Sequence, residues 1–165
     1  MISLETNSSI RGSLFTTGDG GKASLPISES LIKSIGNGIG LDQANAVYID
    51  EFSIAASGSL NIDLSGTLVD RLGNPVVFTA IKEILVIADA ANVNDLVYGN
   101  GATPFIGPLN VGTATVSLKP GNDFHVTNYS AAGWAVVAAT ADILKLANGG
   151  AGTSVTGTIV IVGLA

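Results

Sequence analysis

The sequence contains no cysteine, a single histidine and very few charged residues. Without cysteine it can form no disulfide and offer no thiolate nucleophile or metal ligand, and it needs no oxidising compartment. Charged residues make up 12% of the chain, about half the usual ~25%. A monomer that stands free in solution usually spreads charges over its surface. We therefore expect much of this surface to be buried against other protein subunits.

Basic residues and long hydrophobic runs are also scarce. Seven Lys and Arg stand against thirteen Asp and Glu, which gives a net charge of −6. Binding to a phosphate backbone needs clustered Lys and Arg, so nucleic acid is not an expected partner. The longest apolar stretch, 131–139, has nine residues, whereas a membrane-spanning helix needs about 20. No membrane partner is expected either.

What the sequence does contain is a series of short alternating segments. Between residues 46 and 164, apolar residues recur at every second position, and turns rich in Gly, Asn, Asp or Pro interrupt them. This pattern predicts an all-β, jelly-roll-like antiparallel β-sandwich over residues 46–165. The expected strands are 46–56, 60–64, 67–70, 76–79, 82–88, 96–98, 116–118, 124–126, 134–138, 143–147 and a last one from 155. The continuous apolar run 84–87 is typical of a central strand that is covered on both faces.

Residues 1–45 follow a different pattern, from which we predict an extended, Gly/Ser-rich N-terminal arm. The segments 16–21 and 35–40 carry too many glycines for a regular helix or strand interior. Single apolar residues are nevertheless too frequent for a disordered tail. We expect Leu14, Phe15 and Leu25 to be buried against a neighbouring subunit or a larger assembly. A flexible tail that packs loosely on its own domain is the alternative, and residues 28–33 could form one helical turn.

Catalytic chemistry is not expected anywhere in the chain. His125 lies between Phe124 and Val126, no G-x-S-x-G motif is present, and no partner for this histidine is visible in the sequence, so we interpret it as a surface or interface residue. Gly36-x-Gly38-x-Gly40 lacks the flanking strand, helix and lysine of a phosphate-binding loop and is interpreted as a flexible linker. We predict no cofactor-binding residue.

Acidic and aromatic residues give no site either. The residues Asp89, Asn92, Asn94 and Asp95 could offer oxygen atoms to Ca²⁺, but such residues are also usual turn formers, and we predict no metal site. Adjacent residues of a strand face opposite sides, so Asp50 and Glu51 cannot act as a glycosidase pair. Trp134 lies inside an apolar strand, where it is expected to fill the core rather than to bind sugar.

The order of strand and turn motifs resembles a known family. The motifs are 60–66 (LNIDLSG), 68–70 (LVD), 72–74 (LGN), 78–79 (FT), 81–82 (IK), a turn at Gly99, 118–121 (LKPG), 133–134 (GW), 142–144 (DIL) and 147–150 (ANGG). Over residues 46–165 the chain resembles the head decoration or cement proteins of tailed bacteriophages. The N-terminal 45 residues match no such pattern.

The resemblance implies a virion structural protein without enzymatic activity. Proteins of this type are β-sandwiches that bind the outer surface of the major capsid shell and stabilise it. They would be made in the host cytoplasm and then reside in the virion. The resemblance implies the major capsid protein as a partner, and a symmetric shell predicts a homo-oligomer, with a trimer favoured over a dimer. A phage fibre or a receptor- or carbohydrate-binding β-sandwich module is the alternative, and a hydrolase is a third one.

Overall fold

The computed structural model describes residues 2–18, 21–66 and 68–165 as strands joined by turns and loops. The strands are β1 (Leu4–Gly18), β2 (Gly21–Asn37), β3 (Gln43–Ala44), β4 (Ala46–Ile54), β5 (Ser59–Asp63), β6 (Leu68–Val69), β7 (Pro75–Val76), β8 (Ala80–Ala88), β9 (Leu96–Gly99), β10 (Thr115–Leu118), β11 (Asp123–Thr127), β12 (Trp134–Ala135), β13 (Ile143–Asn148) and β14 (Val155–Leu164). These ranges contain no helix that could cross a membrane.

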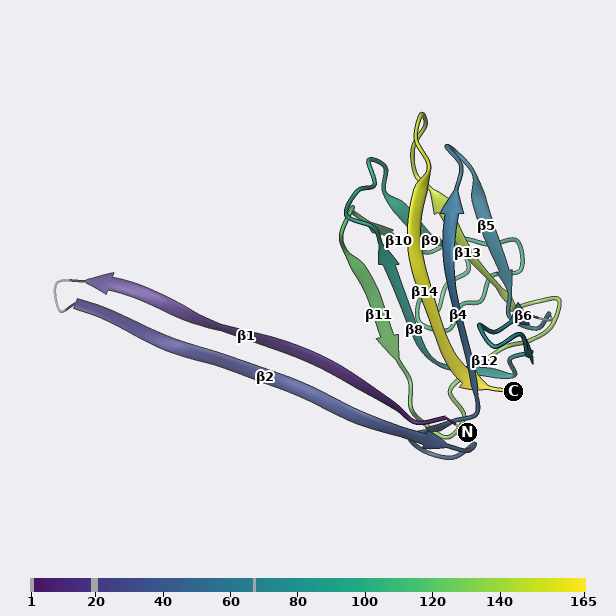
Figure 1. The fold of residues 1–165 in the computed structure, drawn as a ribbon, viewed down its shortest axis with the longest axis horizontal. Helices are drawn as coiled ribbons and strands as arrows, with labels where there is room; N and C mark the ends of the chain where they lie inside the picture. The colour runs from purple at the N-terminus through teal and green to yellow at the C-terminus, as the bar shows by residue number, and fades with distance from the viewer. Residues whose placement is uncertain (1, 19–20, 67) are drawn as a thin grey trace.

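Eight of these strands form two facing antiparallel sheets (Figure 1). Sheet I has the order β11-β8-β14-β4, with the short β12 added to β8, and sheet II has the order β10-β9-β13-β5. The consecutive strands β4 and β5, β8 and β9, β10 and β11, and β13 and β14 lie in opposite sheets. This is the connectivity of a jelly roll. The predicted all-β sandwich is confirmed.

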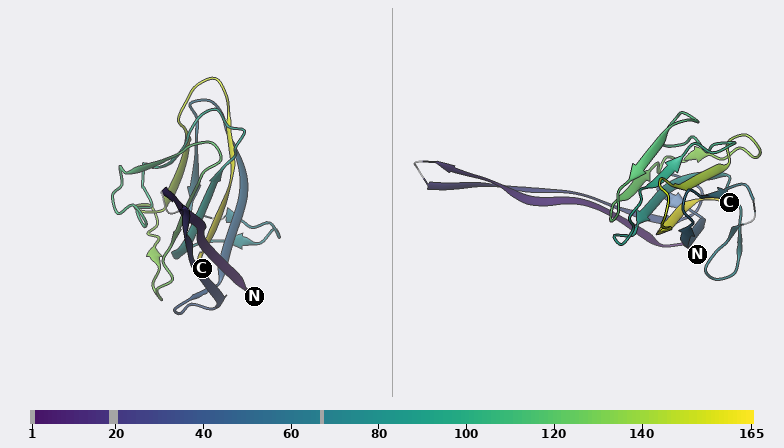
Figure 2. Two further views of the ribbon diagram at one scale, coloured as in Figure 1. Left: turned by 90° about the vertical axis from the view of Figure 1, so that its left-hand side faces the viewer. Right: turned by 90° about the horizontal axis from the view of Figure 1, so that it is seen from above.

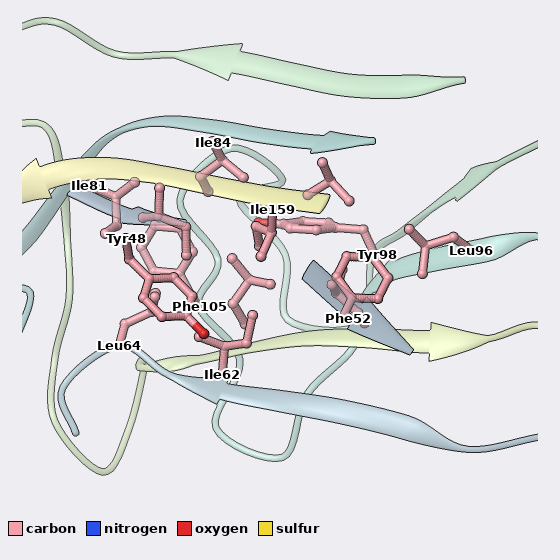
Figure 3. Close-up of a cluster of buried hydrophobic side chains, with 14 of the residues drawn as sticks. Tyr48, Phe52, Ile62, Leu64, Ile81, Ile84, Leu96, Tyr98, Phe105 and Ile159 are labelled. Atoms are coloured by element: carbon pink, nitrogen blue, oxygen red, sulfur yellow. The ribbon is translucent and has the colours of Figure 1, made fainter. Parts of the chain in front are cut away.

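The core lies between the two sheets and is built by the alternation that the sequence shows. In β4, Tyr48, Phe52 and Ile54 point inward, and in β14 the residues Ile159 and Ile161 do the same. Figure 3 shows Tyr48, Phe52 and Ile159 in this core together with Ile62, Leu96 and Tyr98 of sheet II. Successive residues of a strand face opposite sides, so the core receives alternate residues of the strands, although Asp50 of β4 is exposed.

One detail of sheet I differs from the prediction. Strand β8 is central, since it lies between β11 and β14. Its apolar run 84–87, however, is covered on one face only. Ile84 and Val86 are fully buried, whereas Leu85 is half-buried and Ile87 is 39% exposed on the outer face. The expectation that both faces are covered is therefore wrong for this part of the strand.

The N-terminal segment forms a long antiparallel β-hairpin, made of β1 and β2, instead of an irregular arm. The ladder runs from the pair Leu4–Ile35 to the pair Gly18–Gly21. Residues 28–33, predicted as a helical turn, lie inside β2, and residues 16–18 and 35–37 are strand despite their glycines. Pairing along the whole ladder outweighs the weak local preference of these glycines. Positions 19 and 20 lie outside the described residues.

The hairpin leaves the sandwich sideways and extends far beyond it (Figures 1 and 2). Strand β1 has 15 residues, which corresponds to a length of about 50 Å. Segment 36–40, at its base, is ordered rather than the predicted flexible linker, since residues 36 and 37 end β2 and residues 38–40 form a bend. Gly38 donates to the Ala44 carbonyl at 3.0 Å, and Gly40 donates to Oε1 of Gln43 at 2.9 Å. Gly38 has φ +151° and lies against the end of the Gln43 side chain, so a larger residue would strain the backbone and displace that side chain.

Candidate functional site: the N-terminal hairpin

The two faces of the hairpin differ in polarity. Residues that pair across an antiparallel ladder point to the same side, so even-numbered residues of β1 share a face with odd-numbered residues of β2. We call this side the apolar face. Its large apolar residues are Leu4, Ile10, Leu14, Leu25, Ile27, Leu31 and Ile35.

The opposite side is polar along most of its length. It carries Asn7, Ser9, Arg11, Ser13, Ser24, Ser28, Ser30 and Ser34, with Phe15 and Ile32 as its large apolar residues. Residues 4–37 contain three acidic and three basic residues, so the net charge of −6 lies on the rest of the chain. The hairpin is thus an amphipathic ribbon without net charge, attached to an acidic sandwich.

The outer part of the apolar face is open to solvent. Ile10 is 73% exposed, Leu14 64% and Leu25 63%, and Leu31 is similarly exposed. A two-stranded hairpin is at best marginally stable in water, because it has no second layer to bury its side chains. An exposed apolar surface of this kind marks an interaction site. The outer hairpin is therefore the candidate site of this chain.

The structure brings together two of the three predicted contact residues. Leu14 and Leu25 face each other across the ladder, whereas Phe15 pairs with Ser24 on the opposite side and is 71% exposed. The sequence interpretation did not single out Ile10, Ile27 and Leu31, which share the face of the leucine pair. The alternation of apolar residues at 25, 27, 31 and 35 is the signal that could have indicated them.

At its base, the apolar face packs against the outer face of sheet I. Ile35, Ala44, Tyr129 and Val162 form a second small core there, and it is separate from the main one. Leu4, Val47 and Val160 pack against its rim. We call this contact the root of the hairpin. The root shows that the apolar face of the ribbon and the outer face of sheet I fit each other.

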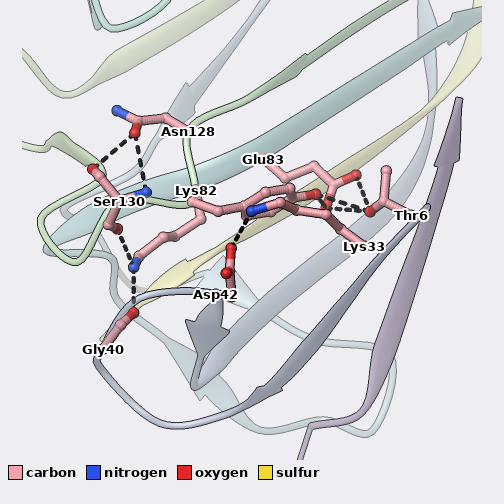
Figure 4. Close-up of polar contacts among 9 residues, drawn as sticks. Thr6, Lys33, Gly40, Asp42, Lys82, Glu83, Asn128 and Ser130 are labelled. Carbon is pink, nitrogen blue, oxygen red and sulfur yellow. Dashed lines mark hydrogen bonds and ion pairs between the residues drawn. The ribbon is translucent and has the colours of Figure 1, made fainter. Parts of the chain in front are cut away.

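A buried carboxylate links the hairpin to the sandwich at the root (Figure 4). Glu83 of β8 is 8% exposed and accepts hydrogen bonds from the Thr6 hydroxyl of β1 at 2.9 Å and from the Tyr129 hydroxyl at 2.7 Å. Nε2 of His125 lies 2.7 Å from the same carboxylate. Burial is the main cause that raises the pKa of Tyr129, and the neighbouring carboxylate of Glu83 adds to it. This tyrosine therefore stays protonated and donates.

Two lysines fix the segment that follows the hairpin. The fully buried Lys82 donates to the carbonyl of Gly40 at 2.9 Å and to that of Ser130 (Figure 4). Burial lowers the pKa of Lys82, and the charge of Asp42 opposes this shift. Lys33 of β2 forms an ion pair with Asp42 and lies 5.3 Å from the ring centre of Tyr129. These contacts hold the base of the hairpin at a defined place on sheet I.

The remaining candidate residues have structural contacts. Asn92 pairs with the backbone of Thr156, Asn94 donates to Asn148, and Asp95 accepts from Lys119 at 2.7 Å. These side chains bind distant segments of the sandwich rather than the backbone of their own turn. Among the described residues, no group of three His, Cys, Asp or Glu side chains could hold a metal ion. Trp134 packs against the main core but stays half-buried.

His125 is better connected than the sequence indicated. Its side chain is 20% exposed and pairs with Glu83, a residue 42 positions away. The other groups on this carboxylate, Thr6 and Tyr129, tie the hairpin to the sandwich rather than form a nucleophile and base. In this arrangement His125 supports the root.

The comparisons with known proteins add little to this description. No family model matches the chain, and no curated protein sequence matches it. Among solved structures, the Yersinia pseudotuberculosis-derived mitogen is similar with a TM-score of 0.32 and 12% sequence identity, over 73% of this chain and 86% of that chain. A likeness of this size carries no argument about function.

Proposed function

We propose that this chain is a virion structural protein, a capsid decoration or cement protein that binds the outer surface of the major capsid shell and stabilises it. The observation that carries the proposal is the hairpin. Its apolar face stands clear of the sandwich over most of its length. A ribbon of about 50 Å can reach from one subunit of an assembly to the next. The proposed role of the hairpin is to make such a contact between subunits.

Two further properties support this proposal. Jelly rolls of eight strands are a frequent architecture of viral capsid domains, although lectin domains share it, so this support is an analogy of fold. The acidic sandwich suits the outside of a shell better than the inside, which faces the phosphate backbone of packaged DNA. The proposal assigns no catalytic role to any residue.

Immunogold electron microscopy of purified particles tests this function. Antibodies against the sandwich should label particles from the virus that encodes the chain over the whole head surface. Labelling confined to fibre tips would instead support the alternative of a fibre or receptor-binding module. Particles that lack the chain altogether would contradict both functions.

Binding to shells that were assembled without this chain tests the role of the hairpin. Full-length protein should sediment with such shells. The short-hairpin variant, in which residues 9–30 are replaced by Asn-Gly, should bind at least tenfold more weakly. The replacement removes ten residues from each described strand and keeps the pair Ser8–Leu31, so the register and the root are retained. Ser13→Lys, on the polar side, is the matched control and should bind like the wild type.

A further inference from the structure

The outer face of sheet I carries an apolar surface that continues from the root. Its rows follow the register of the sheet, in which Ile49 of β4 pairs with Val160 of β14, and Val160 pairs with Leu85 of β8. Ile87 lies in the next row, beside Thr158. We call Ile49, Leu85 and Ile87 the outer strip, since Val160 between them already packs at the rim of the root. These residues are half-buried or, for Ile87, exposed.

The outer strip and the apolar face of the hairpin both border the root, where the hairpin already packs on sheet I. At the root, Leu4 and Ile35 of the hairpin pack with Val47, Val160 and Val162 of sheet I. Beyond the root, both surfaces continue, but the hairpin diverges sideways from the sheet (Figures 1 and 2). The apolar face of the hairpin and the outer face of sheet I therefore contact each other at the root. Beyond the root, both surfaces are open to solvent.

The outer hairpin and the outer strip do not meet within this chain (Figures 1 and 2). The ladder of β1 and β2 is continuous from its base outward, and its outer apolar residues stay exposed. Both open surfaces are therefore free for a contact with a second molecule.

The exposed area of the chain agrees with this. The solvent-accessible surface is 8976 Å² for a mass of 16.5 kDa. A compact monomer of that mass exposes about 7,500 Å², so roughly 1,400 Å² are in excess. Stable protein–protein interfaces bury about 1,200–2,000 Å² in total. One such interface takes about 800 Å² from each partner, so the excess on one chain is nearly the area of two such patches, as expected for a chain that both gives and receives a hairpin.

We propose that the partner of the hairpin is a second copy of this chain, and that the apolar face around Leu14, Leu25 and Ile27 docks on the outer strip of that copy. The hairpin of the second copy docks in the same way, either on the outer strip of the first copy in a closed pair or on that of the next copy in a closed ring. A shallow hollow on the hairpin lies next to this apolar face, and its lining includes Ile10 and Leu31 together with Glu29 and three serines. This proposal specifies the partner of the surface on which the proposed function rests.

Light scattering on the full-length chain is the first test. At micromolar concentration the wild type should show two or three times the monomer mass of 16.5 kDa. Leu25→Lys, in the hairpin, and Ile87→Lys, in the outer strip, should each weaken the association at least tenfold. Both positions are exposed, so the fold should survive the substitutions, which circular dichroism checks.

Two matched controls should keep the wild-type mass. Ser13→Lys introduces the same charge on the polar side of the hairpin, and Thr115→Lys introduces it on the exposed β10 of sheet II. A wild type that remains a monomer at all concentrations overturns the proposal. Oligomers of Leu25→Lys as stable as those of the wild type overturn it as well.

A mixing experiment separates exchange between copies from other modes of self-association. Leu25→Lys has an intact outer strip, and Ile87→Lys has an intact hairpin, so a mixed pair regains one complete contact. Native mass spectrometry, with one variant labelled with ¹⁵N, should show mixed oligomers at concentrations where neither variant associates alone. The absence of mixed oligomers would mean that hairpin and strip do not contact each other.

The outcome also distinguishes this proposal from the proposed function. Self-association without any binding to particles supports the exchange of hairpins and counts against the capsid role. If the chain binds to shells but is always monomeric, the capsid role is supported and the exchange of hairpins is contradicted. The shell protein would then be the partner of the hairpin.

Discussion

The sandwich and the hairpin are both built from antiparallel ladders of backbone hydrogen bonds. They differ in whether a second layer of side chains covers the ladder. In the sandwich, each sheet covers the other, and residues such as Ile84, Leu146 and Ile159 are fully buried. In the outer hairpin, most large apolar residues of the same kind are more than half exposed, and Ile27 is 43% exposed. The ladder of the hairpin is nevertheless the longest in the molecule.

This difference shows which interaction makes a strand stable. A hydrogen bond within the chain replaces one to water and contributes only about 0.5–1.5 kcal/mol net, whereas full burial of a large apolar side chain contributes about 1.5–3 kcal/mol. The sandwich has both contributions, and the outer hairpin has only the first. The hairpin depends on its root and, by our proposal, on a second copy.

The largest contrast is expected for leucines in the two regions. Leu146→Ala empties a fully buried position of β13 and should lower the free energy of unfolding by about 2–5 kcal/mol. Leu31→Ala, in the hairpin, should change it by less than about 0.5 kcal/mol when it is measured at concentrations at which the chain is monomeric. Urea denaturation followed by the fluorescence of Trp134, the only tryptophan, measures both. Equal effects would mean that the hairpin belongs to the same folding unit as the sandwich.

Two tyrosines allow a finer comparison. Tyr129→Phe removes a donor to the buried Glu83 at the root and should destabilise by about 1–3 kcal/mol, because it leaves a carboxylate oxygen short of a partner. In the main core, the hydroxyl of Tyr98 is buried and meets no hydrogen-bond partner among the described residues. Tyr98→Phe should therefore be neutral or stabilise by up to about 1 kcal/mol.

Hydrogen exchange locates the effect of the root substitution. In Tyr129→Phe, the amide groups of β1 and β2 should exchange faster, while those of β14 keep their protection. Uniformly faster exchange in both regions would show that the root supports the whole fold rather than the hairpin. Tyr98→Phe serves as the control and should leave the exchange of the hairpin unchanged.

The smallest expected effect is the loss of stability of the sandwich at acidic pH, through Asp142. The hydrogen bond from the Thr103 hydroxyl, together with others from the Ala139 amide and the Ser65 hydroxyl, holds the pKa of Asp142 below its usual value of 3.8. Because the folded state favours the charged form, this contribution is complete above pH 3.8 and is lost as the pH falls through the lowered pKa.

Asp142→Asn tests this dependence on pH. It should destabilise the sandwich at pH 7, and its difference from the wild type should narrow when denaturation curves are measured below about pH 4. A difference that stays constant down to pH 2 would contradict the assignment. Since Asp142 lies in the sandwich, the exchange of the hairpin amides should not follow this titration.

The strands of the sandwich could be predicted well because the alternation of apolar and polar residues that marks each strand lies within the strand itself. Strand β4 was expected at 46–56 and found at Ala46–Ile54, and β14 was expected from 155 and begins there. An alternation of period two has one main structural explanation, a strand with one buried face. The predicted core position of Trp134 was only half right, since the two residues of β12 lie at the end of β8.

The hairpin and its root could not be predicted to the same extent because their partners are distant in the sequence. Leu4 pairs with Ile35, and local glycines and serines conceal this pairing. Lys82 and Glu83 precede an apolar run and gave no sign that they are buried. Their partners include Gly40, Thr6 and Ser130, more than 40 positions away. Such contacts follow only from the assembled fold.

The charged and hydrogen-bonded root has a mechanical consequence. A ribbon of about 50 Å acts as a lever, so a rotation of only about 5° at its base displaces the tip by about 4 Å. A flexible linker would spread the tip over a wide arc. Lys82 is fully buried and donates to the carbonyl groups of Gly40 and Ser130, so it restricts rotation at the base of the hairpin. The position of the tip is thus set by a few bonds at the other end of the lever.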